Sequence, residues 1–330
     1  MDAAIQNVRV QKVIAITSFI LFLAKIFAWY LTQSVAILTD ALESIVNIIA
    51  GLIGWYSLNV SAKPRDFDHP YGHGKIEFVS AAVEGTFIII SGVFLIYTAI
   101  QNLVSPLAVS KLDMGILLIG ATAIINYGLG FYSVRIGTAN HSLALISSGK
   151  HLKSDAWSSA GIIGGLLLLI FTGIQWIDAV VAIFFSFFII YTGFTIIKSS
   201  VSGIMDAADD ELIVKLVATI NSKRRLNWVD LHNLRVIKYG ALLHIDCHLT
   251  VPWYFNVDEA HKEIDELTAL VRLEYGEMVE FFVHSDGCME FSCAICHKSD
   301  CPVRKHAFEK TITWTVHNVR NNAKHNAATE

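Results

Sequence analysis

The chain has 330 residues, of which 54% are hydrophobic and only 16% are charged, and its mean hydropathy is +0.51. This composition excludes a disordered chain and a simple soluble enzyme. The formal net charge of −4 gives no electrostatic reason to expect a nucleic-acid partner. Of the 54 Lys, Arg, Asp and Glu residues, 21 lie in residues 1–200 and 33 lie in residues 201–330. We therefore expect a lipid-embedded domain over residues 1–204 and a water-exposed part after it.

Six apolar segments are long enough to cross a bilayer as helices, which takes roughly 20 residues. Lys and Arg gather before the first segment and after the second, fourth and sixth, whereas the opposite connections carry only Lys111. By the positive-inside rule both termini are expected in the cytoplasm. We expect no removable signal peptide, because the first segment lacks a cleavage pattern. The segments lie near residues 13–31, 34–57, 78–102, 114–134, 156–175 and 177–197.

Ionisable residues inside such segments are costly to place in lipid and mark functional sites. Asp40, Glu43 and Asn47 share one stripe of the second helix, and His151 and Asp155 share one face at the start of the fifth. If the two faces meet, three oxygen ligands and one imidazole converge, a set suited to a divalent transition metal. The alternative is that these side chains form hydrogen bonds between packed helices.

The pattern changes to soluble periodicities after residue 204. Residues 209–223 and 257–276 are predicted to form amphipathic helices, which suits their spacing of apolar side chains. Three strands are predicted over 228–240, 241–251 and 277–286. This α-β-β-α-β order favours a small three-stranded sheet with both helices on one face, in a domain covering residues 205–289. Alternation along the second strand places Cys247 in the core and His248 on the opposite face.

A Cys/His-rich tail covers residues 290–330. The spacing C-x4-C-x2-C-H-x3-C has the short ligand separations of a structural zinc site. An iron–sulfur cluster and a metal-free set of reactive thiols are alternatives. Residues 319–330 are expected to be disordered. The candidate ligands are Cys288, Cys293, Cys296, His297 and Cys301.

Together these features resemble the cation diffusion facilitator family of divalent-metal/proton exchangers. The resemblance covers roughly residues 10–289 and rests on KIFAWYLTQSVAIL, HPYGHGKIE, KHLKSDAWSS, the acids of the second segment and the spaced histidines of the soluble domain. It implies an α-helical membrane protein with six transmembrane helices, followed by a small α+β ferredoxin-like (αββαβ) cytoplasmic domain. It also implies a homodimer without enzymatic activity.

The resemblance implies a transport site as well. The family's usual pattern takes two ligands four apart on the second helix and His with Asp four apart on the fifth. Glu43, Asn47, His151 and Asp155 stand at the matching positions of this chain. Glu in place of Asp lengthens the arm, and Asn in place of Asp removes a charge but keeps a carbonyl ligand. Asp40 is expected either to substitute as a ligand or to orient Glu43.

Further metal sites follow from the same resemblance. The loop after the second helix offers Asp66, His69 and His73, and a loop with exposed histidines is the alternative. The predicted cytoplasmic ligands are His232, His248, His261, His284 and Asp286, and histidines scattered over a solvated surface are the alternative. Lys75 and Asp206 resemble a charge interlock between subunits, with two ordinary interfacial charges as the alternative.

The expected function is efflux of a divalent metal from the cytoplasm in exchange for protons. His151 must be neutral and the carboxylates ionised to hold metal, so protonation releases it. Zinc is the favoured metal, and iron, manganese, cobalt and cadmium are possible. The expected location is a bacterial inner membrane, with lipid, metal ion and protons as partners. One alternative is a membrane-anchored metal sensor or buffer. An intramembrane metalloenzyme is disfavoured, because the chain has no HExxH motif.

Overall fold

The computed structural model describes the backbone of residues 2–32, 35–104, 112–172, 176–240, 242–276 and 279–329. It divides into two compact units, Met1–Met205 and Asp206–Glu330, which are described separately. Inside the helices of the first unit some side chains lie outside the description. They belong to residues 2, 28–29, 31–43, 46, 102, 104–116, 162, 165–179 and 181–182.

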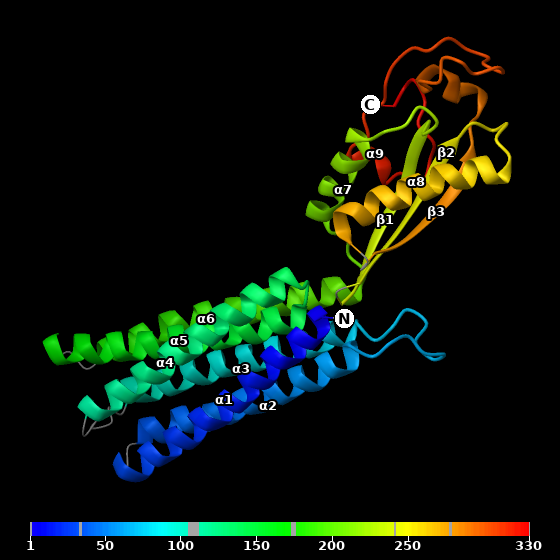
Figure 1. Ribbon diagram of the computed structural model, residues 1–330. Coiled ribbons are helices and arrows are strands. Elements are labelled where there is room, and N and C mark those ends of the chain that lie inside the picture. Colours follow the sequence, from blue (N-terminus) through cyan, green and yellow to red (C-terminus); the bar gives the residue numbers. More distant parts are fainter. Residues whose placement is uncertain are drawn as a thin grey trace. The chain divides into compact units, whose positions relative to one another are not determined.

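The first unit consists of long helices that run side by side, at the positions of the predicted apolar segments (Figure 1). The connection after the second helix contains Pro64, Pro70 and Gly72, which do not continue a helix. The helices are α1 (Asp2–Thr32), α2 (Val35–Ser61), α3 (Ile76–Val104), α4 (Leu112–Ala139), α5 (Leu143–Thr172) and α6 (Trp176–Ile204).

Four stretches of these helices are long and apolar enough to cross a membrane, within the part of the chain that the structure describes. They lie in α1, α3, α4 and α6 and cover Ala3–Phe27, Ile76–Gln101, Leu117–Ala139 and Ile183–Ile204. The two remaining long helices, α2 and α5, carry the polar residues of the predicted transport site. The first unit is therefore a membrane domain, and the full set of six spans remains a prediction.

Small residues let the helices approach closely. A Cβ atom on Gly193 of α6 would lie 2.7 Å from the carbonyl oxygen of Gly85 on α3, and one on Gly85 would lie 3.0 Å from that of Gly193. Gly130 of α4 and Gly149 of α5 meet in the same way, at 2.7 and 2.8 Å. Backbone therefore contacts backbone in the α3–α6 and α4–α5 pairs, which are the most extensively packed pairs of the unit.

The first unit buries polar side chains and exposes large apolar ones. Glu84, Gln11 and Ser147 are each 0% exposed, whereas Phe184 is 71% exposed and Phe27 is 63% exposed. This is the inverse of a soluble domain, and it is what a helix bundle surrounded by lipid requires.

The second unit has the predicted α-β-β-α-β order. In the sheet, β1 pairs antiparallel with β2 after a turn in which Gly240 has a φ of 63°, and β2 pairs parallel with β3. α8 packs on β2, β3 and α7 (Figure 1). Cys247 is 1% exposed, which confirms its predicted place in the core. The elements are α7 (Asp210–Ser222), β1 (Asp230–Tyr239), β2 (Leu242–Val251), α8 (Val257–Tyr275) and β3 (Val279–Gly287).

The end of the chain departs from the predicted disorder. After the short 3-10 helix η1 (Glu290–Ile295), the chain packs back on the domain and forms α9 (Val316–Val319). Trp314 is 2% exposed, Val319 is 0% exposed, and the guanidinium of Arg224 lies 3.8 Å from the centroid of the Trp314 ring. The polar composition of residues 319–330 predicts disorder, but Val319 and His325 of this stretch are buried against the folded domain.

Candidate metal centres

Three side chains of the predicted transport site meet inside the first unit. On α5, Nε2 of His151 lies 3.7 Å from Oδ1 of Asp155, one helical turn further on. From α2, the Asn47 amide donates a hydrogen bond of 2.6 Å to Oδ2 of Asp155. The side-chain carbonyl oxygen of Asn47 is buried and has no hydrogen-bond partner among the described residues. The two predicted helical faces therefore meet at Asn47 and Asp155.

This donor set suits a divalent transition metal. It offers an imidazole nitrogen, carboxylate oxygens and the side-chain oxygen of Asn47, which no donor of the described part of the chain satisfies, although buried polar atoms normally have partners. His151 is 5% exposed, so its ring is enclosed by protein. Asp40 and Glu43 belong to α2, but their side chains lie outside the described residues, and their roles stay predictions.

Sequence reasoning missed Glu84, which lies beside this group. Glu84 of α3 lines one narrow space together with Asn47, His151 and Ser148. Its Oε1 accepts a hydrogen bond of 2.6 Å from Ser148, and its Oε2 accepts one from Ser147. The signal available in the sequence is a single acid inside an apolar segment, which a search for ligand pairs four residues apart passes over.

A column of buried polar groups continues from Glu84 toward the beginning of α3. Glu77 lies two turns earlier, is 3% exposed and accepts hydrogen bonds from Ser61 at 2.7 Å and Ser142 at 2.5 Å. Gln11 of α1 donates to Ser148 at 3.0 Å. Two separate groups of hydrogen-bonded, buried side chains thus lie between the candidate transport site and one end of the helix bundle, one around Glu84 and one around Glu77.

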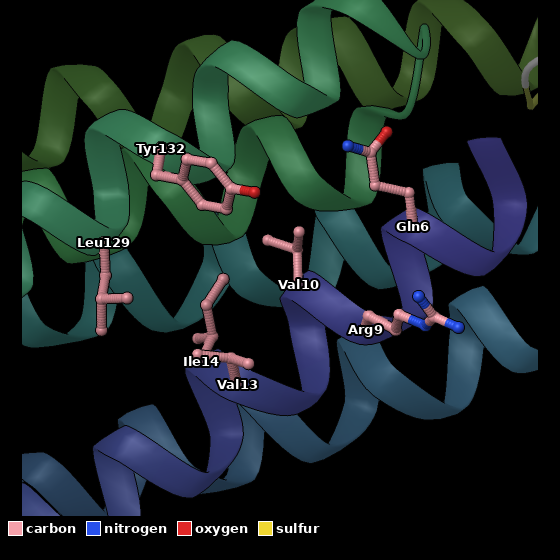
Figure 2. A pocket seen from close by; sticks show the side chains of 7 residues that line it. All are labelled: Gln6, Arg9, Val10, Val13, Ile14, Leu129 and Tyr132. Carbon is pink, nitrogen blue, oxygen red and sulfur yellow. The ribbon is translucent and has the colours of Figure 1, made fainter. Parts of the chain in front are cut away.

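A larger cavity of about 310 Å³ lies between α1 and α4 (Figure 2). Its lining is mostly aliphatic, and Arg9 is the charged side chain among the residues shown. It offers no carboxylate, imidazole or thiol ligand, so we assign no metal to it. The residues that line it are Gln6, Arg9, Val10, Val13, Ile14, Leu129 and Tyr132.

The loop between α2 and α3 brings Asp66, His69 and His73 together. Oδ1 of Asp66 lies 2.9 Å from Nδ1 of His69, and Oδ2 lies 3.3 Å from Nε2 of His73. The hydrogen bond with His69 lowers the pKa of the Asp66 carboxyl below its ordinary value. One ligand atom from each residue fits within 4.8 Å of the others, so the loop can hold a metal ion.

The sheet of the second unit carries another such group. His232, His248 and His284 are directly opposed in register on β1, β2 and β3. Oδ2 of Asp286 lies 3.1 Å from Nδ1 of His248 and 3.5 Å from Nε2 of His232. Ligand atoms of His232, His248 and Asp286 all lie within 4.8 Å of one another, which makes them a candidate three-ligand site.

The other two predicted cytoplasmic ligands lie at the margin of this group. Nε2 of His284 is 3.8 Å from Oδ1 of Asp286, and its side chain is 66% exposed. His261 of α8 lines a pocket of about 260 Å³ together with Asp286, while its Nε2 lies 3.7 Å from Asp265. Neither residue belongs to the group of ligand atoms that lie within 4.8 Å of one another. His261 and His284 are therefore candidate additional ligands that would have to move their side chains to reach the same metal ion.

The predicted tail ligands lie near one another but are not arranged as a metal site. Burial raises the pKa of the Cys288 thiol, and Cys296, Cys293 and Cys301 raise it further. All four of these thiols are free. Among the residues described, however, no three ligand atoms of the tail lie within 4.8 Å of one another. The His297 ring packs on Phe308 at a centroid distance of 5.2 Å. Metal binding by the tail therefore stays a prediction.

The predicted charge interlock also stays a prediction. Lys75 lies just before α3 in the first unit, and Asp206 opens the second unit with a positive φ of 55°. Their pairing would join two units that are described separately.

Comparison with known protein families gives two matches along the chain. Residues 12–205 match the cation efflux transmembrane domain, and residues 208–288 match the cytoplasmic domain of cation efflux proteins. The first match alone covers more than half of the chain. The tail after residue 288 lies beyond both matches.

Curated relatives resemble the chain over most of its length. An uncharacterized transporter of Synechocystis sp. is 30% identical over 237 residues, which are 72% of this chain and 76% of the relative. The cation-efflux pump FieF of Escherichia coli O1:K1 is 29% identical over 276 residues, 82% of this chain and 89% of the relative. The FieF pump of Shewanella oneidensis is 26% identical over 273 residues, 82% and 90% of the two chains.

Proposed function

The chain belongs to the cation diffusion facilitator family, and on that premise we propose that it exports zinc from the cytoplasm in exchange for protons. Membership makes it a membrane-integral efflux transporter of divalent metal cations. Zinc is the proposed substrate because it favours tetrahedral sites that contain histidine. Fe(II), Mn(II), Co(II) and Cd(II) are the competing substrates, since the site is rich in oxygen ligands.

The meeting of His151, Asp155 and Asn47 carries the proposal. To hold a metal ion, His151 must be neutral and Asp155 must be ionised. Metal binding therefore displaces protons, and protonation from the more acidic side releases the metal. The helices that bear these residues, α2 and α5, would open the site alternately to the two sides of the membrane. Glu43 would supply a further carboxylate ligand.

The assembly that we propose is a homodimer with six membrane spans in each subunit and both termini in the cytoplasm. Its proposed location is a bacterial inner membrane. We propose no enzymatic role for it. The Asp66, His69 and His73 group and the His232, His248 and Asp286 group would then face the cytoplasm. Metal bound by the second group would stiffen the dimer and favour transport, because a ligand shifts the protein toward the state it binds more tightly.

The test is metal uptake by proteoliposomes under an imposed proton gradient. Zn(II), Fe(II), Mn(II), Co(II) and Cd(II) are offered to liposomes carrying the unaltered protein, Asp155→Ala or the matched control Asp68→Ala. Asp68 is exposed and belongs to no candidate site. We expect transport of Zn(II) that collapses with the gradient, is lost in Asp155→Ala and persists in Asp68→Ala. Uptake by Asp155→Ala at the unaltered rate would contradict the assigned site.

A membrane-anchored metal sensor is the second candidate, because the ligand atoms of His232, His248 and Asp286 already lie within 4.8 Å of one another without help from the membrane domain. It predicts that no metal crosses under any gradient while the soluble unit still binds metal. In that case the Asn47 position would be evidence of a lost transport site.

A further inference from the structure

The C-terminal segment of the chain returns to the candidate site on the sheet. Asp230, the first residue of β1, is 1% exposed, and its carboxylate is held by His325, which is 2% exposed. The His325 amide donates to Oδ2 of Asp230 at 3.0 Å, and Nδ1 of its ring contacts Oδ1. Nε2 of His325 lies 3.2 Å from the carbonyl oxygen of Asn318. Residues 318–325 are thereby fixed against the start of β1.

Asp230 also contacts a candidate metal ligand. Its Oδ2 lies 3.1 Å from Nδ1 of His232. Among the described residues Nδ1 has no aligned hydrogen-bond partner, and the Asp230 carboxylate is the acceptor beside it. The opposite nitrogen, Nε2, faces Asp286 at 3.5 Å. A carboxylate on one ring nitrogen fixes the tautomer and leaves the other nitrogen to the metal.

Lys324, the residue before His325, contacts the same site, and its positive charge opposes metal binding there. Nζ of Lys324 lies 3.6 Å from Oδ1 of Asp286 and donates to the carbonyl oxygen of Gly287 at 2.8 Å. A cation so close to a ligand carboxylate competes with a metal ion for its charge. Two neighbouring residues of the tail therefore contact the site, one through Asp230 and one directly.

We propose that the C-terminal segment, residues 316–329, is a working part of the cytoplasmic metal site. His325 clamps Asp230, Asp230 positions His232 for metal, and Lys324 opposes binding by pairing with Asp286. Asp230 and His325 are positioning residues rather than ligands. The inference rests on the proposed metal binding by His232, His248 and Asp286, but it does not rest on transport.

The experiment measures Zn(II) affinity of the full-length protein in detergent, by competition with a chromophoric chelator. His232→Ala identifies the binding step that belongs to this site. We expect His325→Ala to weaken that step about 10- to 100-fold, as loss of an orienting partner does. His325→Asn should retain the affinity, because its amide places a donor where Nδ1 stood. Lys324→Met should strengthen the step about two- to fivefold, the range of an exposed ion pair.

The matched control is His317→Ala, an exposed histidine of the same segment. A structural role for the tail alone would weaken binding in both Lys324→Met and His325→Asn, and that result overturns the inference. An affinity of His325→Ala within twofold of the unaltered protein overturns it as well. If the unaltered protein lacks a step that His232→Ala removes, both the inference and the proposed metal site fail together. Transport is a separate measurement, so a loss of transport does not contradict the role inferred for the C-terminal segment.

Discussion

Glu84 is a residue of the membrane unit, beside the predicted ligands, whose chemistry suits more than helix packing. Its carboxylate is enclosed on α3 and accepts hydrogen bonds from Ser147 and Ser148 of α5, about one turn before His151. Polar groups inside a membrane domain are rarely retained without a task. A carboxyl group at this position can take and give up protons beside the metal, whereas an amide cannot.

We therefore expect Glu84→Gln to slow proton-driven Zn(II) uptake at least tenfold, the effect typical of losing a partner that supports a metal site. The amide keeps the shape of the side chain and one oxygen that can accept from Ser148. Stopped-flow uptake into proteoliposomes measures the rate. Glu211→Gln, an exposed acid of α7, is the control. An unchanged rate in Glu84→Gln would reduce Glu84 to a helix-packing role.

At the residue scale, the sequence indicates ligands wherever spacing alone brings them together. Asn47 meets Asp155 as two helical faces predict, and His232 and His248 meet because they are opposed across a hairpin. Glu84, Asp230 and His325 lie beyond such reasoning. Their partners are set by packing between elements distant in the chain, and Asp230 and His325 are 95 residues apart.

At the start of α7, Asp209 combines a helix cap with an ion pair. Asp209 caps the helix by accepting from the Leu212 amide at 3.0 Å, and it pairs with Lys238 of β1. Burial raises the pKa of Asp209, but the hydrogen bonds with Lys238 and Leu212 outweigh burial and hold it below the ordinary value of 3.8. A lowered pKa means that ionised Asp209 stabilises the helix above pH 3.8 and that this contribution is lost as the pH falls through the folded-state value.

Asp209→Asn keeps a capping oxygen and removes the charge. We expect amide hydrogen exchange of residues 210–222 to be about two- to fivefold faster than in the unaltered protein at pH 7, since the ion pair is partly exposed. The difference should shrink at low pH, below 3.8, as the pH falls through the lowered folded-state pKa and Asp209 itself loses its charge. Exchange by mass spectrometry measures both, and Asp258→Asn in the first turn of α8 is the control. A difference of the same size at both pH values would contradict an ionic contribution.

At the element scale, the strands and helices of the soluble unit follow their periodicities closely. The α-β-β-α-β order and the buried side of β2 are both predicted from alternation and amphipathicity. The C-terminal segment is the exception. Its local sequence is mostly polar, which is typical of a segment without stable structure. Trp314 and Val319 are nevertheless buried, because the folded domain offers a complementary apolar surface.

At the scale of the whole molecule, the cysteines allow metal binding by the tail to be measured separately from metal binding at the other candidate sites. The five cysteines lie in the second unit, and Cys247 is sealed in its core. The remaining four lie between β3 and Arg304, whose guanidinium holds the carbonyl oxygens of Cys293 and Cys296 at 2.8 and 2.9 Å. Outside η1 this stretch forms no helix or strand, and a bound metal can stabilise such a segment.

Co(II) therefore distinguishes the tail from every histidine and carboxylate site. We expect Co(II) added to the metal-free full-length protein to give a sulfur-to-metal charge-transfer absorption in the near ultraviolet. Cys293→Ser and Cys296→Ser should abolish it, and Cys247→Ala should retain it. Excess Zn(II) should displace the Co(II) signal if the site prefers zinc. Visible Co(II) bands without the sulfur transition would show that metal binds the protein but not the tail thiols.

The bond between Asp230 and His325 also bears on the order of events in folding. During synthesis β1 leaves the ribosome long before residue 325 is made, so the carboxylate at its start must first stay hydrated or lie buried without the hydrogen bonds of His325. Closing a loop of this length is slow compared with forming the β1–β2 hairpin. The sheet can therefore pair early, but the Asp230 carboxylate gains its hydrogen bonds from His325 only when the C-terminal segment docks. Chains that stop short of residue 325 should form the hairpin and then fail to mature, and they would offer quality-control proteases a soluble domain that stays partly open.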